Sequence, residues 1–149
     1  MPAQVTKREW GILRGFSGQA MVEGALVLLL LFVFLFAVFE VGRLIQVQQA
    51  LTDAAREGAR RSIAPLTQTS ILPTPADVTS VVEGYLEAAS LDKNLATITV
   101  DQSVTLAGST TQYSRVTVTY PYQVMTIRMF GMLNMNLTGS SLMRNETSP

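Results

Sequence analysis

The sequence predicts an α+β protein in which a long N-terminal transmembrane and stalk helix is followed by a small head. Three observations lead to this fold class. Residues 24–39 form an uncharged apolar run, residues 40–61 continue with helical periodicity, and residues 77–149 combine one more helical pattern with alternating segments. We therefore expect the head to contain one more helix and an antiparallel sheet of about three strands.

The apolar run has the composition of a membrane anchor. It reads GALVLLLLFVFLFAVF, and adding residues 20–22 and Val41 extends it to a helix of about 33 Å, enough for a hydrocarbon core of roughly 30 Å. A buried core helix is the alternative, but 149 residues offer too little surface to cover such a helix on all sides. A cleaved secretory signal is disfavoured, because the run is too long and no small-x-small cleavage site follows it.

Composition argues against several classes of function. The chain has no Cys and no His, which removes disulfide scaffolds, thiolate metal sites, Cys nucleophiles and the commonest general base. Its 11 acids balance its 11 bases, so no polycationic field for nucleic acid is expected. We expect no enzymatic activity, no cofactor, no metal and no small-molecule substrate. A membrane-tethered enzyme is the least favoured hypothesis, since Lys93 is the only Lys outside the leader.

The residues before the apolar run have a distinctive order. A short basic leader, residues 1–18, ends in Gly18, the apolar stretch begins after Gln19, and Glu23 is the fifth residue after that glycine. Glycine lets an active site approach the backbone closely. This junction resembles the one that prepilin peptidases cut in type IV pilin-like proteins. The resemblance implies cleavage after Gly18 and a free α-amine on Gln19.

Glu23 lies one turn into the apolar region, where a carboxylate is costly unless it is paired. In filaments of pilin-like proteins the corresponding acid is thought to meet the N-terminal amine of a neighbouring subunit. The resemblance therefore implies that Glu23 sets the register of assembly, with Gln19 as its partner. The alternative is an interfacial acid that snorkels to the membrane surface or is protonated.

Beyond the membrane, residues 40–61 predict that the helix continues to about Ser62, and Pro65 stops it. Small residues at helical spacing allow close packing, either against the protein's own sheet or against another subunit. These residues are Ala54, Ala55, Gly58 and Ala59. Glu40 and Arg43 share one helix face, where they form either a local ion pair or a contact with other subunits or assembly machinery.

The same region carries a more specific pattern. It runs from Gly18-Gln-Ala-Met-Val-Glu23 through Phe39-Glu40-Val-Gly42-Arg43 to the segment from Gln49 to Arg60. This stretch resembles the TadE-like family, whose members are pilin-like proteins of tight-adherence (Flp-type) pilus systems, and the tail of the chain is similar more loosely. The resemblance implies a type IV pilin-like fold and a subunit that primes or caps a pilus.

The remaining chain divides into a linker, residues 63–76, and the head, residues 77–149. Thr74 and the two residues after it predict the start of a helix that ends at about Ser90. Alternation predicts strands over 96–106 and 115–122, where Pro121 marks a strand end or an edge. Residues 126–134 are ambiguous, with a short helix as one interpretation, and residues 135–144 are a candidate third strand.

Together these observations predict a minor pilin or pseudopilin in tight-adherence pilus assembly. The N-terminus would lie in the bacterial cytoplasm, the helix in the inner membrane and the head outside the cytoplasm. Expected partners are a prepilin peptidase, other pilin-like subunits, the inner-membrane assembly machinery and membrane lipid, but not nucleic acid. The alternative is an uncleaved single-pass envelope protein whose head binds a partner or the cell surface.

Overall fold

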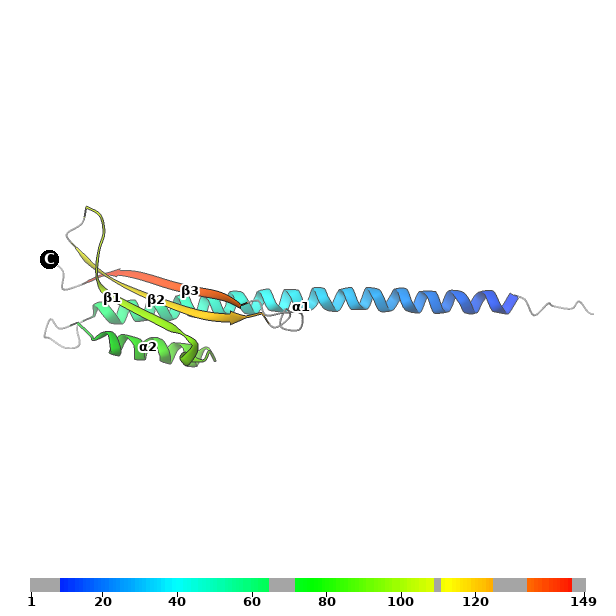
Figure 1. Cartoon of the computed structure of the whole chain (residues 1–149), viewed down its shortest axis with the longest axis horizontal. Coiled ribbons are helices and arrows are strands. Elements are labelled where there is room, and N and C mark those ends of the chain that lie inside the picture. Colours follow the sequence, from blue (N-terminus) through cyan, green and yellow to red (C-terminus); the bar gives the residue numbers. More distant parts are fainter. Residues whose placement is uncertain (1–8, 65–71, 109–110, 125–133, 146–149) are drawn as a thin grey trace, which may run out of the picture. The chain divides into compact units, whose positions relative to one another are not determined.

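The structure, a computed structural model, describes residues 9–64, 72–108, 111–124 and 134–145 (Figure 1). Its elements are α1 (Glu9–Ile63), α2 (Pro75–Ala88), the 3-10 helix η1 (Lys93–Leu95), β1 (Thr97–Thr105), β2 (Gln112–Gln123) and β3 (Asn134–Arg144). These elements confirm the predicted α+β fold class, with a long N-terminal helix, a further α-helix and a three-stranded antiparallel sheet. The chain divides into two compact units, Met1–Phe39 and Glu40–Pro149.

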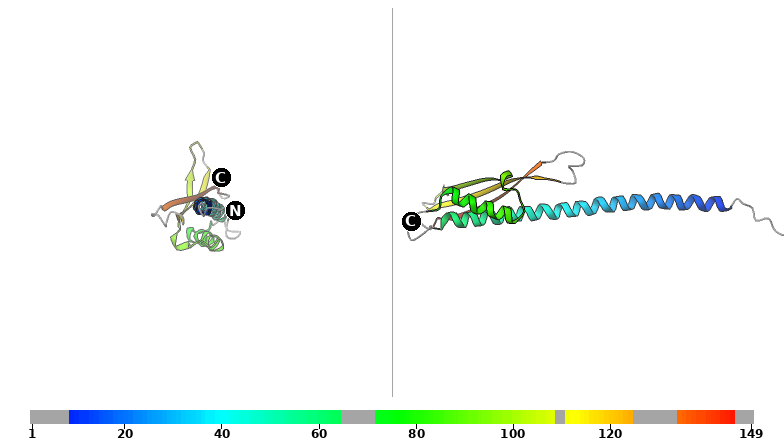
Figure 2. Two further views of the ribbon diagram at one scale, coloured as in Figure 1. Left: turned by 90° about the vertical axis from the view of Figure 1, so that its right-hand side faces the viewer. Right: turned by 90° about the horizontal axis from the view of Figure 1, so that it is seen from below.

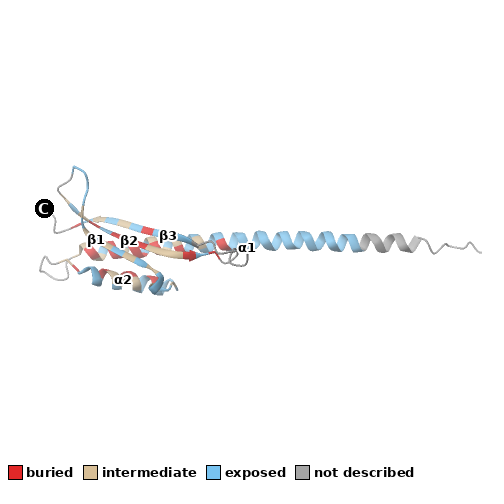
Figure 3. Cartoon of the chain, viewed as in Figure 1, coloured by how far each residue is buried: buried red, intermediate tan, exposed pale blue. Residues whose placement is uncertain are grey.

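The N-terminal unit contains the apolar part of α1. Every residue from Gly18 to Phe39 is exposed, and Figure 3 shows this stretch in pale blue. Leu30 and Phe34, for example, keep 70% and 65% of their surface exposed. The helix is long and apolar enough to cross a membrane, with a mean hydropathy of 2.8 in its most apolar part. Lipid rather than water is the solvent that such a surface requires, because transfer of each Leu or Phe out of water gains roughly 1.5–3 kcal/mol.

The second unit, Glu40–Pro149, is called the head from here on. In it, a layer of two helices packs against one face of the sheet (Figure 2). The strand order is β1-β2-β3, and both neighbouring pairs are antiparallel. The helix layer consists of α2 and of α1 from Glu40 onward. The buried apolar side chains of these elements form one core. It contains Val47, Leu51, Ala54, Ala55, Ala59, Val78, Val82, Leu86, Val116, Val118, Tyr122, Val124 and Leu137.

The start of α2 follows the signal in the sequence. Thr74 is the N-cap: its hydroxyl accepts from the backbone N–H of Asp77, and the Asp77 carboxylate accepts from the backbone N–H of Thr74 in return. The Thr74 hydroxyl also donates to the Asp77 carboxylate, and this hydrogen bond, together with the one from the Thr74 backbone N–H, lowers the pKa of Asp77 below its usual value. The helix ends at Ala88, near the predicted end at Ser90, which has a left-handed φ of 59° that a helix cannot continue through.

The three predicted strands are present, with small shifts at their ends. Pro121 lies inside β2, beyond Thr119, the last residue of β2 that pairs with β1. At Pro121 the strand pairs with β3 alone, so the missing N–H need not remove a ladder hydrogen bond. The ambiguous residues 126–134 lie outside the described residues, except for Asn134, which begins β3.

Strand β3 approaches α1 closely at Gly139. A Cβ atom at this position would lie 2.5 Å from the backbone carbonyl carbon of Leu51 and 2.7 Å from the backbone nitrogen of Thr52. About one turn earlier on α1, the Gln48 side-chain amide donates a hydrogen bond of 2.9 Å to the backbone carbonyl of Thr138. Backbone contact and this side-chain bond together hold β3 against the helix.

We expect Gly139→Ala to destabilise the head by about 1–3 kcal/mol, because the added methyl meets helix backbone that cannot turn aside. Hydrogen exchange of the β2 and β3 amides in the full-length protein in detergent micelles measures this loss. Gly84→Ala is the matched control, since a Cβ on this exposed residue of α2 meets nothing within 4 Å. Equal exchange rates in the two variants would contradict the prediction.

Candidate functional site

The predicted processing junction lies on an uncovered part of α1. Gly18 and Gln19 are exposed, and a Cβ on Gly18 would meet nothing within 4 Å. The helix already begins at Glu9, so the junction lies within a helical segment rather than at the start of one.

Glu23 lies among exposed apolar residues, between Val22 at 63% exposure and Leu26 at 57%. In the part of the chain that the structure describes, no ion pair or hydrogen bond involves its carboxylate. A carboxylate surrounded by lipid-facing side chains gains from any cation that reaches it. The structure thus leaves Glu23 available for a partner outside this chain.

Glu40, at the other end of the apolar run, is buried in the head. It is 8% exposed, and its carboxylate accepts a hydrogen bond of 2.6 Å from the hydroxyl of Tyr122. Tyr122 is itself only 2% exposed. Burial raises the pKa of Tyr122 to about 12, and the hydrogen bond to Glu40 acts in the same direction. The tyrosine is therefore a neutral donor that satisfies part of a buried carboxylate.

Arg43 meets the same tyrosine from another side. Its guanidinium carbon lies 5.7 Å from the centre of the Tyr122 ring, which is the geometry of a cation–π contact. Sequence analysis placed Glu40 and Arg43 on one helix face, and the structure brings both to Tyr122. Sequence analysis did not identify Tyr122 as their partner, because this tyrosine lies 82 residues beyond Glu40 in the chain. The alternation in β2 put Tyr122 on the core face, and that was the available signal.

The small residues of α1 lie inside the head of their own chain. Ala54, Ala55 and Ala59 have no exposed surface. At Gly58 a Cβ would lie 2.6 Å from a methyl of Val82 and 3.2 Å from a methyl of Val116. The sequence left open whether these residues pack against the protein's own sheet or against another subunit. In the structure they pack within their own chain, against the sheet and α2.

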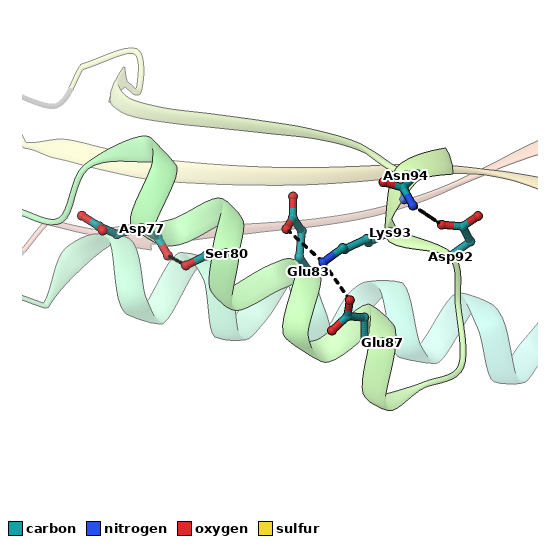
Figure 4. A network of polar contacts seen from close by, with 7 residues as sticks. All are labelled: Asp77, Ser80, Glu83, Glu87, Asp92, Lys93 and Asn94. Carbon is teal, nitrogen blue, oxygen red and sulfur yellow. Dashed lines mark hydrogen bonds and ion pairs between the residues drawn. The ribbon is translucent and has the colours of Figure 1, made fainter.

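The charged side chains on the head surface pair locally. Lys93 of η1 lies 2.8 Å from the Glu87 carboxylate and 4.0 Å from that of Glu83, both on α2 (Figure 4). On α1, Arg56 pairs with Asp53 in the same exposed setting, and such pairs contribute at most about 1 kcal/mol. Within the described residues no group of three His, Cys, Asp or Glu side chains could hold a metal ion.

The helix α1 is long and apolar enough to cross a membrane once, and the elements that follow it form a small α+β unit. Residues 18–60 match the family model described as TadE-like protein, so this segment of the chain is similar to that family. No curated protein and no solved structure matches the chain.

The Tyr122–Glu40 contact gives the head a pH dependence at high pH. The folded head holds the Tyr122 proton up to about pH 12, whereas an ordinary tyrosine loses it near pH 10. The stabilisation is complete below pH 10 and is lost as the pH rises from there to about 12. We expect the free energy of unfolding to fall more steeply over this range in the wild type than in Tyr122→Phe, by at most about 1.4 kcal/mol per pH unit.

Urea unfolding of the full-length protein in micelles at a series of pH values measures this difference. Tyr122→Phe is also expected to cost roughly 1–3 kcal/mol at neutral pH, since Glu40 loses a donor. Tyr85→Phe, which changes an exposed tyrosine of α2, serves as the control and should follow the wild type. Parallel curves for the wild type and Tyr122→Phe would show that the Tyr122 hydroxyl plays no such role.

Proposed function

We propose that this protein is a minor pilin or pseudopilin-like structural subunit in the assembly of a tight-adherence pilus. In this proposal a prepilin peptidase removes residues 1–18, which leaves 131 of the 149 residues. The observation that carries the proposal is the extent of the family match, which begins at Gly18 and so leaves out residues 1–17 of the leader. The N-terminus faces the cytoplasm and the head lies on the other side of the inner membrane.

The exposed surface of α1 supports assembly through helix packing. From Gly18 to Phe39 the helix is uncovered, so lipid or the helices of other pilin-like subunits can surround it. Glu23 is the carboxylate within this surface, and cleavage would create an amine on Gln19 that can pair with it in a neighbouring subunit. Because a carboxylate in lipid gains strongly from such a pair, the pair would select one axial register.

The head supports a structural role rather than catalysis. In the head, the sheet and α2 pack on α1 from Glu40 onward through an apolar core and through the hydrogen bond from Tyr122 to Glu40. Several of its surface charges pair with neighbours, Arg56 with Asp53 and Lys93 with Glu87. We therefore propose that the head presents a surface to partners outside the cytoplasm, namely pilus subunits and assembly machinery, and performs no reaction.

We expect Gly18→Ala to block processing, because a side chain at the cut site obstructs the close approach of the peptidase to the backbone. The intact mass of the protein from its native membrane, with and without active prepilin peptidase, measures cleavage. Gly24→Ala is the matched control, since this glycine is equally open in the structure. A full-length mass for the wild type in both cells would instead make the protein a permanently anchored envelope protein.

We expect Glu23→Ala to leave membrane insertion intact and to weaken association with other pilin-like subunits, because it removes a charge from lipid together with its pairing partner. Co-purification of tagged protein with those subunits from native membranes measures the association. Glu87→Ala, which removes an exposed carboxylate from α2, should leave it unchanged. Normal co-purification of Glu23→Ala would refute the register role.

A further inference from the structure

The outer edge of β3 carries unpaired backbone groups. The carbonyl of Thr138 points away from β2, because it accepts a hydrogen bond from the Gln48 side chain. In an antiparallel ladder, alternate residues direct both of their backbone groups to the same side. The N–H and C=O groups of Ser140 and Leu142 therefore also face outward, and within the described residues they have no hydrogen-bond partner.

The same alternation leaves backbone groups unpaired on the opposite edge of the sheet, which is formed by β1 (Figure 1). Since Thr138 turns away from β2, its partner Thr119 directs its backbone groups to β1, and so does Thr117. On β1, Ile98 and Val100 then direct their N–H and C=O groups outward. In the part of the chain that the structure describes, these groups have no partner either.

Neither edge carries the devices that natural proteins use against edge-to-edge pairing. Such devices are Lys, Pro or inward-pointing charges on the edge strand, or a β-bulge that twists the edge away. From Thr97 to Val100, β1 has none of them, and its bulge and the charge of Asp101 begin only after this stretch. On β3, the stretch from Thr138 to Leu142 is equally free of charge and Pro. Two short edges that are open to strand pairing thus lie on opposite sides of one sheet.

Anchoring in one membrane restricts how two copies of the chain can meet through these edges. Glu40, the first residue of the head, directly follows the apolar run in the chain, so copies inserted in the same orientation keep Glu40 at one membrane surface. If the same edge of both copies paired, with both helix layers on one side of the joint sheet, the two strands would run antiparallel. Tyr122, which binds Glu40, lies five residues from the partner of Thr99 and Ser140 on β2. Antiparallel pairing centred there would place the two Glu40 residues roughly 30 Å apart along the strands.

We propose that the heads of two copies of this chain associate side by side, with β1 of one copy added in parallel to the β3 edge of the other. Within one head β1 and β3 run in the same direction, because each is antiparallel to β2. Their pairing therefore keeps both heads in one orientation and both helix layers on one side of the extended sheet. The contact is heterologous, so it leaves an open edge at each end and can be repeated. The proposal requires that two copies share a membrane, and it does not rest on a role in a pilus.

The side chains of the two edges match in one register. Two rows of hydroxyl side chains cross the face of the sheet that points away from the helices, namely Thr97–Thr119–Thr138 and Thr99–Thr117–Ser140. With Ser140 opposite Thr99 of the second copy, both rows continue across the contact. The Ser140 N–H then donates to the carbonyl of Ile98 of the second copy, and the Ser140 carbonyl accepts from the N–H of Val100, as a parallel ladder requires.

The helix side of the β3 edge has space for the added strand. Gln48, which reaches this edge at Thr138, also lines a groove on α1 together with Gln49, Thr52, Asp53 and Arg56. Helix α2 contacts β1 within one head. When β1 of the second copy joins β3, its α2 therefore comes to lie beside this groove, and the helix layer continues together with the sheet.

Disulfide cross-linking tests the pairing and its register, since the chain has no Cys of its own. Thr99→Cys and Ser140→Cys, both at exposed positions, are made as separate full-length proteins, reconstituted together in phosphatidylcholine vesicles and oxidised. Opposite residues of neighbouring strands lie about 5 Å apart, within the Cα range of a disulfide. In one head Thr99 and Ser140 flank Thr117 on both sides, at about twice that spacing.

We expect the dimer band of this mixture to be several-fold stronger than that of Thr105→Cys mixed with Ser140→Cys, because Thr105 lies beyond the bulge, roughly 15–20 Å farther along β1. Each single variant alone should stay monomeric, since a heterologous contact does not bring these residues next to their own copies. Dimers in the single variants, or equal bands in the two mixtures, would overturn the proposal. The vesicles hold no other pilus component, so the result does not depend on the proposed pilus function.

Leu142→Pro in the Ser140→Cys protein tests whether the backbone of β3 makes the contact. The N–H of Leu142 faces the open edge, so proline removes a hydrogen bond to the second copy and none within the head. We expect this change to weaken the dimer band several-fold, while Leu142→Ala, which loses the same side chain but keeps the N–H, leaves it unchanged. Hydrogen exchange of the β2 amides checks that the head remains folded. An unchanged band in the folded Leu142→Pro variant, or equal losses in both variants, would refute strand addition at β3.

Discussion

The close packing of one stripe of α1 against the sheet and α2 is the constraint on which the head depends. Ala54, Ala55 and Ala59 have no exposed surface, and Gly58 leaves room for Val82. Any larger side chain in this stripe would push the layers apart, because protein interiors contain few voids that could absorb it. The second half of α1 is therefore the central element of the head's core, and the head cannot be regarded as a domain tethered by an independent helix.

The surroundings of α1 change within one residue. Phe39 is 68% exposed and Glu40 is 8% exposed, which inverts the usual rule that apolar residues are buried and acids exposed. Two different environments explain the inversion. The exposed apolar run is suited to lipid, whereas side chains of the head surround Glu40. Tyr122 makes the inversion tolerable by donating a hydrogen bond to the carboxylate.

Sequence alone predicted the elements but not the contacts between them. The cap at Thr74, the alternation in the strands and the apolar run are local signals, and local physics fixes each of them. The contact between Tyr122 and Glu40 joins residues 82 positions apart, and no local pattern encodes it. The environment of the small residues stayed open for a related reason, because the same spacing suits a neighbouring helix and the protein's own sheet.

Sequence analysis assigned residues 1–18 to a leader, but the helix begins at Glu9, inside that leader. The glycine of a processing signal serves recognition of the backbone, and one exposed Gly costs a helix only about 1 kcal/mol. A cleavage boundary therefore need not be a helix boundary, and the two have to be argued from different residues.

Polar contacts at both ends of the packed stripe fix its register. At one end Glu40 binds Tyr122, and at the other the buried Ser62 hydroxyl lies 2.6 Å from that of Ser114 on β2. Between them the small residues repeat at four-residue spacing, so a slip by one helical turn of about 5.4 Å would preserve much of the apolar packing. The same slip would break both polar contacts, and a hydrogen bond typically contributes about 0.5–1.5 kcal/mol. Apolar burial therefore holds the layers together, and the two polar pairs select one position along the helix.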